Sequence, residues 1–183
     1  APLLDKAWAE EAGLGWIGKH SNVINSQRGS WMLIGHLLTT EPLVADAPAR
    51  SLCGRCSACI DACPTTAIRE PFVVDSNRCL AYHTIENRES QLPEAIRTAL
   101  GPWIAGCDIC QDVCPWNHRN LPVSEEPELQ PRAWMLDLKR DDLLQWDDAT
   151  WDERLRGSAL RRIKPWMWRR NATAAEPDQA PTL

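Results

Sequence analysis

The stretch "CGRCSACIDACP", Cys53 to Pro64, decides the chemistry of this chain and much of its fold. Its cysteines follow the spacing C-x₂-C-x₂-C-x₃-C-P, by which proteins bind [4Fe–4S] clusters through thiolates. A second stretch, "CDICQDVCPW" from Cys107 to Trp116, keeps the end of this pattern but lacks its first cysteine. The missing ligand must therefore come from elsewhere, and the last unassigned cysteine is Cys79 in "RCLAYHTIE".

The eight cysteines are enough for two clusters with four ligands each. In two-cluster ferredoxins the last cysteine of each motif binds the other cluster. By this rule, Cys114 becomes a ligand of the cluster at the first motif, and Cys63 becomes a ligand of the cluster at the second motif. Cys79 is then the fourth ligand of that second cluster. The sequence therefore predicts cluster 1 on Cys53, Cys56, Cys59 and Cys114, and cluster 2 on Cys63, Cys79, Cys107 and Cys110.

Disulfide bonds and zinc are the alternative uses of these cysteines. Four disulfides would suit a secreted domain, but they do not explain two Cys-Pro endings or four cysteines within eleven residues. Zinc sites often use paired C-x₂-C knuckles, which is a different spacing. Iron–sulfur binding is the interpretation that explains the whole pattern.

Length and composition set further limits. A chain of 183 residues is one ordinary domain or two small ones. It has no apolar run of about 18 residues, so we expect no membrane span. Reduced cysteines and oxygen-sensitive clusters favour the cytoplasm. The chain begins with Ala1 rather than Met, which we interpret as the start of a fragment.

Local patterns predict a mixture of helices and strands. Residues 1–13 resemble a helix, with Pro2 in the first turn and Gly13 at the C-cap. The segment 14–40 is expected to contain a hairpin, in which "SNVIN" turns at "SQRGS" into "WMLIGHLLTT", a strand buried on both faces. The remaining expectations are a linker at 41–52, a helix in "LPEAIRTALGPWIAG", a loop at 121–133, helices at 137–146 and 150–170, and disorder at 172–183.

Charge is unevenly distributed. The net charge is −5, yet the segment from Arg154 to Arg170 holds seven basic residues and no acidic one. Such a patch, interleaved with Trp166 and Trp168, can hold a phosphate backbone and stack on bases. The alternative is a solvated end of an amphipathic helix. The ten tryptophans are interpreted mainly as core residues or amphipathic anchors.

Beyond the cysteine motifs, "GLGWIGKHSNVIN", "RCLAYHTIE" and "LRGSALRRIKPWMWRRN" closely resemble segments of the epoxyqueuosine reductase family, over about residues 1–172. This resemblance implies an α+β chain that reduces epoxyqueuosine to queuosine at the wobble position of tRNA. Electrons would pass through two [4Fe–4S] clusters to cobalamin. It also implies three regions and a tail: part of a cobalamin-binding α/β catalytic domain at 1–52, a ferredoxin-like module at 53–118, a helical, HEAT-like tRNA-binding segment at 119–171, and the disordered tail at 172–183.

The resemblance also implies roles for individual residues. Cobalamin would contact Lys19, Asn22, Val23, Ile34 and Ala81, and tRNA would contact Arg88, Arg161 and Arg162. The proton donor of the family is an aspartate that would precede Ala1; Asp5 falls beyond the matching position. No catalytic residue is therefore assigned, and the fragment alone is expected to be inactive. The expected partners are tRNA carrying epoxyqueuosine and an external low-potential electron donor, and the chain is expected to be a monomer.

Two other functions remain open. A corrinoid-dependent reductive dehalogenase has the same plan of cobalamin and two clusters, but the "YHTIE" and "GSALRRIK" matches disfavour it. A plain two-cluster electron carrier would bind no corrinoid. Lys19 is either a cobalamin contact or a solvated side chain. None of the four histidines is assigned as a metal ligand; the structural or surface interpretation applies to His20, His36, His83 and His118.

Overall fold

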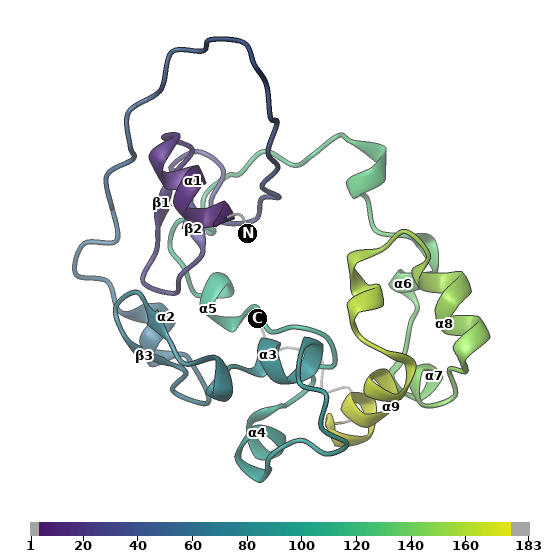
Figure 1. The fold of residues 1–183 in the computed structure, drawn as a ribbon. Helices are drawn as coiled ribbons and strands as arrows, with labels where there is room; N and C mark the ends of the chain where they lie inside the picture. Colours follow the sequence, from purple (N-terminus) through teal and green to yellow (C-terminus); the bar gives the residue numbers. More distant parts are fainter. Residues whose placement is uncertain (1–3, 177–183) are drawn as a thin grey trace. The chain divides into compact units, whose positions relative to one another are not determined.

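The computed structural model describes residues 4–176, which fall into two compact units (Figure 1). The first unit combines Ala1–Asp75 with Asp108–Val123, and the second combines Ser76–Cys107 with Ser124–Leu183. Each unit therefore takes its residues from two separate stretches of sequence. Among the described residues, no helix is long and apolar enough to cross a membrane.

The first unit contains short helices and two small antiparallel sheets. In one sheet Trp16 pairs with Ile24, and in the other Ile68 pairs with Val74. The first helix lies within the predicted range and ends at Glu11, and its C-cap is Ala12 where Gly13 was predicted. The elements of this unit are α1 (Asp5–Glu11), β1 (Trp16–Ile17), β2 (Val23–Ile24), α2 (Ala58–Asp61), β3 (Ile68–Glu70), β4 (Val73–Val74) and α5 (Ile109–Asp112).

The core of the first unit is small and is built around the cysteine motifs. Trp16, Ile24 and Cys114 are buried together, and Cys53 and Trp116 pack against them. The rings of Trp16 and Trp116 meet edge to face, with centroids 4.9 Å apart, an arrangement that aromatic pairs prefer. Cys53 and Cys114 are thus part of the hydrophobic packing of this unit.

The predicted hairpin is wrong in this unit. The strand within "SNVIN" pairs with Trp16–Ile17, and the tight turn is closed by a bridge between Asn25 and Gly29. The apolar run after the turn forms neither helix nor strand and belongs to a long irregular segment (Figure 1, dark blue). Leu33, Leu37 and Leu38 are 82%, 90% and 86% exposed. A strand with two apolar faces needs neighbours on both sides, whereas the described residues leave these three leucines largely exposed.

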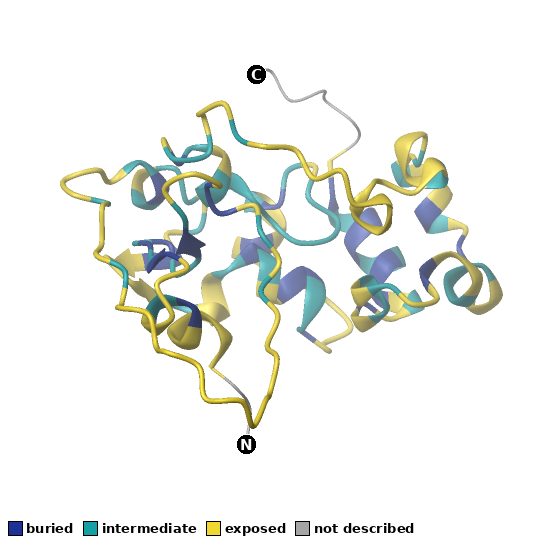
Figure 2. Cartoon of the chain, turned by 90° about the horizontal axis from the view of Figure 1, so that it is seen from above, coloured by how far each residue is buried: buried dark blue, intermediate teal, exposed yellow. Residues whose placement is uncertain are grey.

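The second unit is mostly helical. Its largest core cluster joins the buried side chains of Leu143, Trp146, Leu155, Ile163, Met167, Trp168 and Ala172. Figure 2 shows these helices with one buried and one exposed face. The elements of this unit are η1 (Ser76–Arg78), α3 (Leu80–Ile85), α4 (Glu94–Ala99), η2 (Pro127–Leu129), α6 (Ala133–Leu136), α7 (Arg140–Leu144), α8 (Asp148–Leu155), η3 (Ala159–Arg162) and α9 (Pro165–Ala174).

The long helix predicted at 150–170 is wrong. Two helices, α8 and α9, are separated there by Gly157, the 3₁₀ turn η3 and Lys164, and Pro165 begins the second one. Proline suits the first position of a helix and disrupts its interior. Helix α9 reaches Ala174 with Ala172 fully buried, so disorder was also wrongly predicted for residues 172–174. The end of the predicted tail, 177–183, lies outside the described residues.

Other expectations agree with the structure. The combination of helices and small sheets confirms the α+β class. Residues 41–52 contain no helix or strand, as expected for a linker, and helix α7 lies within the predicted range 137–146. The division into units follows other boundaries than the regions predicted at 1–52, 53–118 and 119–171, which remain functional predictions.

Candidate metal centre

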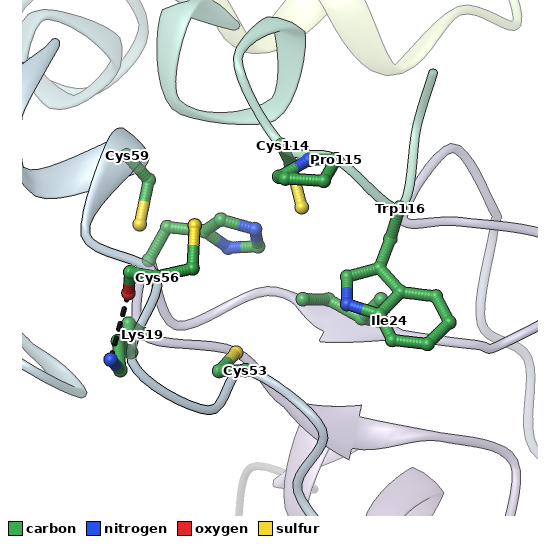
Figure 3. A pocket seen from close by; sticks show the side chains of 9 residues that line it. Lys19, Ile24, Cys53, Cys56, Cys59, Cys114, Pro115 and Trp116 are labelled. Carbon is green, nitrogen blue, oxygen red and sulfur yellow. Dashed lines mark hydrogen bonds between the residues drawn. The ribbon is translucent and has the colours of Figure 1, made fainter. Parts of the chain in front are cut away.

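The four cysteines predicted for cluster 1 line a single pocket in the first unit. Figure 3 shows their side chains around a common space, to which two separate stretches of the chain contribute. Cys59 and Cys114 are buried, whereas Cys56 is exposed. The other residues that line the pocket are Lys19, His20, Ile24, Pro115 and Trp116.

Short-range geometry places each thiol. The backbone N–H of Cys56 donates to the carbonyl of Cys53 at 3.2 Å, which closes a tight turn between the first two cysteines. Cys59 lies on helix α2, and Cys114 follows helix α5, where its N–H donates to the carbonyl of Gln111 at 3.1 Å. Pro115 follows at once and lacks an N–H for helical bonding. The motif spacing thus produces turns and single helical turns that direct the thiols inward.

A polar network holds the segment that carries Cys114. The side chain of Asn117 accepts from the N–H of Ser30 at 2.7 Å and donates to the Ser30 hydroxyl and the Gln111 carbonyl at 2.8 Å. Gly29 has a φ of +66°, and a Cβ there would lie 2.2 Å from the Asn117 Oδ1. The sequence analysis does not predict this network, although Gly29 and Ser30 lie in the quoted turn "SQRGS" and Asn117 directly follows the second cysteine motif.

The electrostatics of the pocket favour a positively charged centre. Burial raises the pKa of the Cys59 thiol, and the neighbouring Cys114, Cys53 and Cys56 raise it further. Burial also raises the pKa of Cys114, with contributions from Cys53 and Cys56. Four thiolates crowded in one pocket repel one another, whereas bound metal ions stabilise the deprotonated form. The residues present therefore fit an iron–sulfur cluster, whose iron ions would stabilise the four thiolates.

Hydrogen-bond donors surround the pocket. The indole Nε1 of Trp16 donates to the sulfur of Cys53 at 3.4 Å. The ammonium of Lys19 donates to the carbonyls of Gly54 and Cys56 at 2.8 and 2.7 Å, the latter drawn in Figure 3. The bond from Trp16 reaches a ligand sulfur, and hydrogen bonds to the sulfurs are one means by which proteins set cluster potentials.

His20 is the buried histidine of this pocket. Its Nδ1 accepts the backbone N–H of Asn22 at 3.2 Å, and its Nε2 is buried without a partner among the described residues. Burial lowers the pKa of His20, a hydrogen bond to the backbone of His20 raises it, and the charge of Lys6 lowers it. Because Nδ1 accepts the hydrogen bond from Asn22, the ring carries its proton on Nε2.

The thiols predicted for cluster 2 fall in both units and are described separately. In the first unit, Cys110 lies on α5. Burial acts to raise the pKa of Cys63, but hydrogen bonds from the backbone of Ile68 and Ala67 and from Thr65 together lower it. In the second unit, Cys79 is the N-cap of α3, and Cys107 packs on the core cluster that contains Leu80. The ligand set of cluster 2 remains a prediction.

No three His, Cys, Asp or Glu side chains among residues 4–176 are grouped as a single metal ion would require. The assignment of the four-cysteine pocket to a cluster rests on the motif spacing and also remains a prediction.

The residues predicted to contact cobalamin fall in both units, and each unit is described by itself. Lys19 and Asn22 lie in the turn between β1 and β2, where Asn22 accepts a hydrogen bond from Lys6 at 3.0 Å. Val23 is buried in β2, and Ile34 lines a separate cavity of about 350 Å³ beside α1. Ala81 lies on α3 in the second unit. The cobalamin contacts remain a prediction.

The residues predicted to contact tRNA lie in the second unit, and two of them have acidic partners. Arg161 pairs with Asp152 at 2.7 Å and lies 4.5 Å from the centre of the Trp151 ring. Arg162 pairs with Glu86. Arg88 is exposed, and its guanidinium contacts the sulfur of Met167.

Two further arginines of the basic segment hold the fold together. Arg169 donates to the carbonyl of Trp146, and Arg170 donates to the carbonyls of His83, Asn87 and Glu89. The segment from Arg154 to Arg170 is therefore less available to an anion than its count of charges suggested.

Two other histidines have partners that fit the structural interpretation. His83 Nε2 bonds to the carbonyl of Asn77 at 2.8 Å, and its Nδ1 lies 3.0 Å from the side-chain amide of Asn87. His36 lies 2.7 Å from Asp5.

Comparison with known proteins places the geometry in a family context. Residues 52–117 match the family described as "4Fe-4S double cluster binding domain". The chain is 77% identical over 182 residues to the epoxyqueuosine reductase of Synechococcus sp. (strain CC9605), covering 100% of this chain and 57% of that protein. It is 67% identical over 169 residues to the epoxyqueuosine reductase of Prochlorococcus marinus (strain NATL2A), covering 92% and 54%.

Solved structures agree with the sequence comparisons. A crystal structure of epoxyqueuosine reductase with a tRNA-Tyr epoxyqueuosine-modified stem loop matches with a TM-score of 0.87 and 30% identity, over 95% of this chain and 46% of that one. The Bacillus subtilis enzyme matches with a TM-score of 0.85 and 30% identity, over 93% and 45%. The chain spans about half the length of the relatives it matches. These findings confirm the predicted similarity to epoxyqueuosine reductase and support two [4Fe–4S] clusters.

Proposed function

We propose that this chain, which matches epoxyqueuosine reductases along its whole length, is the part of such an enzyme that delivers electrons for the reduction of epoxyqueuosine in tRNA. The observation that carries the proposal is the combination of the 77% identity to a reductase with a pocket lined by four cysteines inside the double-cluster segment. The matched structure with a modified tRNA stem loop supports tRNA as the substrate.

The chemistry requires a source of electrons and of protons. Converting an epoxide to an alkene breaks two C–O bonds, consumes two electrons and two protons, and releases the oxygen as water. Iron–sulfur clusters are suited to delivering these electrons at low potential. The resemblance implies cobalamin as the cofactor that, when bound, supplies the low-potential chemistry at the epoxide. The proton donor is proposed to be the aspartate that precedes Ala1 in the family pattern.

The residues of this chain serve the clusters. Cys53, Cys56, Cys59 and Cys114 hold cluster 1, and burial of two of them shields it from water. We assign cluster 2 to the thiols of Cys63, Cys79, Cys107 and Cys110 by the exchange of last cysteines between motifs. The proposed cobalamin contacts remain Lys19, Asn22, Val23, Ile34 and Ala81.

Binding of the tRNA would use the second unit. We propose that Arg88 contacts the tRNA and that Arg161 and Arg162 contribute phosphate contacts. Because Asp152 and Glu86 compete for the last two guanidiniums, their contribution to affinity is expected to be smaller than that of unpaired arginines. The same proposal includes a HEAT-like character for this segment and an external low-potential electron donor. It also includes a cytoplasmic location and a monomeric state.

The test is conversion of the substrate by the full-length gene product, reconstituted anaerobically with iron, sulfide and cobalamin. With a low-potential reductant and tRNA carrying epoxyqueuosine, the modified nucleoside should lose one oxygen atom by mass spectrometry, and omission of cobalamin should abolish the loss. Formation of both clusters without any conversion would contradict the proposed reaction.

The alternative functions give other outcomes in the same preparation. A plain electron carrier would assemble its clusters but would not bind cobalamin. A reductive dehalogenase would bind cobalamin but would leave the tRNA unchanged.

A further inference from the structure

His20 is a buried hydrogen-bond donor that lacks an acceptor within the protein. The side chain is 3% exposed, and its Nε2 has no partner among the described residues. Buried polar groups in native proteins are nearly always hydrogen-bonded, and an exception calls for an explanation. Because His20 lines the pocket together with Cys53, Cys56, Cys59 and Cys114, its acceptor is to be sought there.

The proton on Nε2 follows from the other ring nitrogen. The backbone N–H of Asn22 donates to Nδ1 at 3.2 Å, so Nδ1 acts as an acceptor and carries no hydrogen. In a neutral imidazole the other nitrogen must then be the donor. The orphaned atom is therefore an N–H group, which requires a partner with a lone pair.

The local backbone fixes the ring in place. His20 lies in the tight turn between β1 and β2, in which Gly18 donates to the carbonyl of Asn22 and Ser21 donates to the carbonyl of Gly18, both at 2.8 Å. The ring packs on the Gly18 backbone: a Cβ at this position would lie 3.1 Å from His20 Cε1 and 2.5 Å from Ile24 Cδ1. The turn therefore leaves little room for the imidazole to move away from the pocket.

The contents expected for this pocket supply suitable acceptors. A [4Fe–4S] cluster with four thiolate ligands is negatively charged, and both its inorganic sulfides and its thiolates accept hydrogen bonds. Trp16 already makes a contact of this kind, since its N–H donates to the sulfur of Cys53. We propose that the Nε2–H of His20 donates a hydrogen bond to a sulfur atom of cluster 1 and thereby raises the reduction potential of that cluster. This inference rests on the proposed assignment of cluster 1.

The physical effect has a definite sign. Reduction adds negative charge to the cluster, and a hydrogen bond to sulfur stabilises the reduced form more than the oxidised form. Loss of the donor should therefore make the cluster harder to reduce. His20 is a positioning and tuning residue in this scheme, and it is not assigned as an iron ligand.

The experiment is a redox titration of the full-length gene product with both clusters, followed by electron paramagnetic resonance. His20→Leu removes the donor and retains bulk. At a fixed potential near the wild-type midpoint, the ratio of reduced to oxidised cluster 1 should fall several-fold, where a tenfold change corresponds to about 59 mV for one electron. The potential of cluster 2 should stay unchanged and serves as the internal reference.

Further variants separate the hydrogen bond from a packing effect. His20→Gln restores an N–H donor and should recover part of the lost potential. Trp16→Phe removes the other donor to cluster 1 and should shift the same signal in the same direction. His118→Leu alters an exposed histidine near the second motif and should shift neither potential.

A spectroscopic measurement on the wild-type protein gives an independent test. In the reduced state, isotopically labelled histidine should show a nitrogen coupling to cluster 1 in pulsed electron paramagnetic resonance, and His20→Gln should remove it. Unchanged potentials in His20→Leu with both clusters present, or absence of the nitrogen coupling, would overturn the inference and leave the cluster assignment intact. Failure of the wild-type protein to form cluster 1 would overturn both.

Discussion

The two units of the chain are stabilised in different ways. In the second unit, seven buried side chains, including Trp146, Leu155 and Met167, form an ordinary hydrophobic core between helices. In the first unit, the hydrophobic core consists of Trp16, Ile24 and Cys114, and Cys114 is a predicted iron–sulfur ligand. Small cores commonly depend on metal sites or disulfides for stability. The first unit should therefore depend on iron more strongly than the helical core around Leu155 in the second unit, which contains no cysteine.

Removal of iron should produce the largest difference in stability between the two units. Anaerobic reconstitution is expected to give about eight irons per chain, from two four-iron clusters. After chelation, backbone amides of β2 and α2 should lose most of their protection from hydrogen exchange, because metal binding and folding are coupled. Amides of α9 should keep theirs.

Mass spectrometry of exchanged peptides measures both regions in one sample. Similar loss of protection in α9 would show that the units do not differ in their dependence on iron. An iron content near four, with a free Cys79 thiol, would contradict the assignment of cluster 2.

A substitution in the hydrophobic core of the second unit should lower the stability of that unit without affecting cluster 1. Leu155 is 1% exposed, and Leu155→Ala should destabilise the second unit by about 2–5 kcal/mol, through lost burial and the cavity left behind. Denaturant unfolding followed by tryptophan fluorescence measures the change. The matched control is Leu136→Ala in the same unit, where the leucine is 72% exposed and a change below about 0.5 kcal/mol is expected.

The spectrum of cluster 1 should be unaffected by Leu155→Ala under native conditions. If Leu155→Ala also abolished the spectrum of cluster 1, the stabilities of the two units would not be independent.

The sequence predicted the parts of the first unit that depend on short-range spacing. The cysteines from Cys53 to Cys63 lie close together along the chain, as do Cys110 and Cys114, so their spacing alone constrains where the thiols can point. The apolar run after Ser30 was misjudged because burial of a strand depends on its neighbours, which no local pattern specifies. His20 was treated as structural or surface, since a single histidine in a turn carries no signal until its nitrogens can be traced to partners.

In the second unit the sequence signal was present but misread. Gly157 and Pro165 are both helix-breaking signals, yet the helical periodicity from 150 to 170 was given more weight. The count of seven positive charges between Arg154 and Arg170 was correct, but the use of each charge was not visible in sequence. Arg170 donates to three backbone carbonyls, and the carboxylate of Asp152 accepts from Arg161.

A smaller effect is expected when the basic segment is neutralised. Changing Arg161 and Arg162 to Ala should weaken tRNA binding and lower the salt slope by about one unit for each lost phosphate contact. Affinity of the full-length gene product is to be measured at several salt concentrations. The control is Arg69→Ala, an exposed arginine of the first unit that pairs with Asp75.

Both clusters should remain intact in the double variant, because neither Arg161 nor Arg162 is a predicted cluster ligand. If affinity and slope are the same as in the wild-type protein, Asp152 and Glu86 already neutralise these arginines, and the tRNA contacts lie elsewhere.

The most direct test of the cluster assignment compares two single substitutions. Cys53 lies in the first unit and Cys79 in the second, and they are assigned to different clusters. Electron paramagnetic resonance of the reduced, reconstituted proteins should show that Cys53→Ser alters only the cluster 1 signal and Cys79→Ser only the cluster 2 signal. Loss of the same signal in both variants would contradict the exchange of cysteines between the two motifs and, with it, the assignment of cluster 1 to the pocket in the first unit.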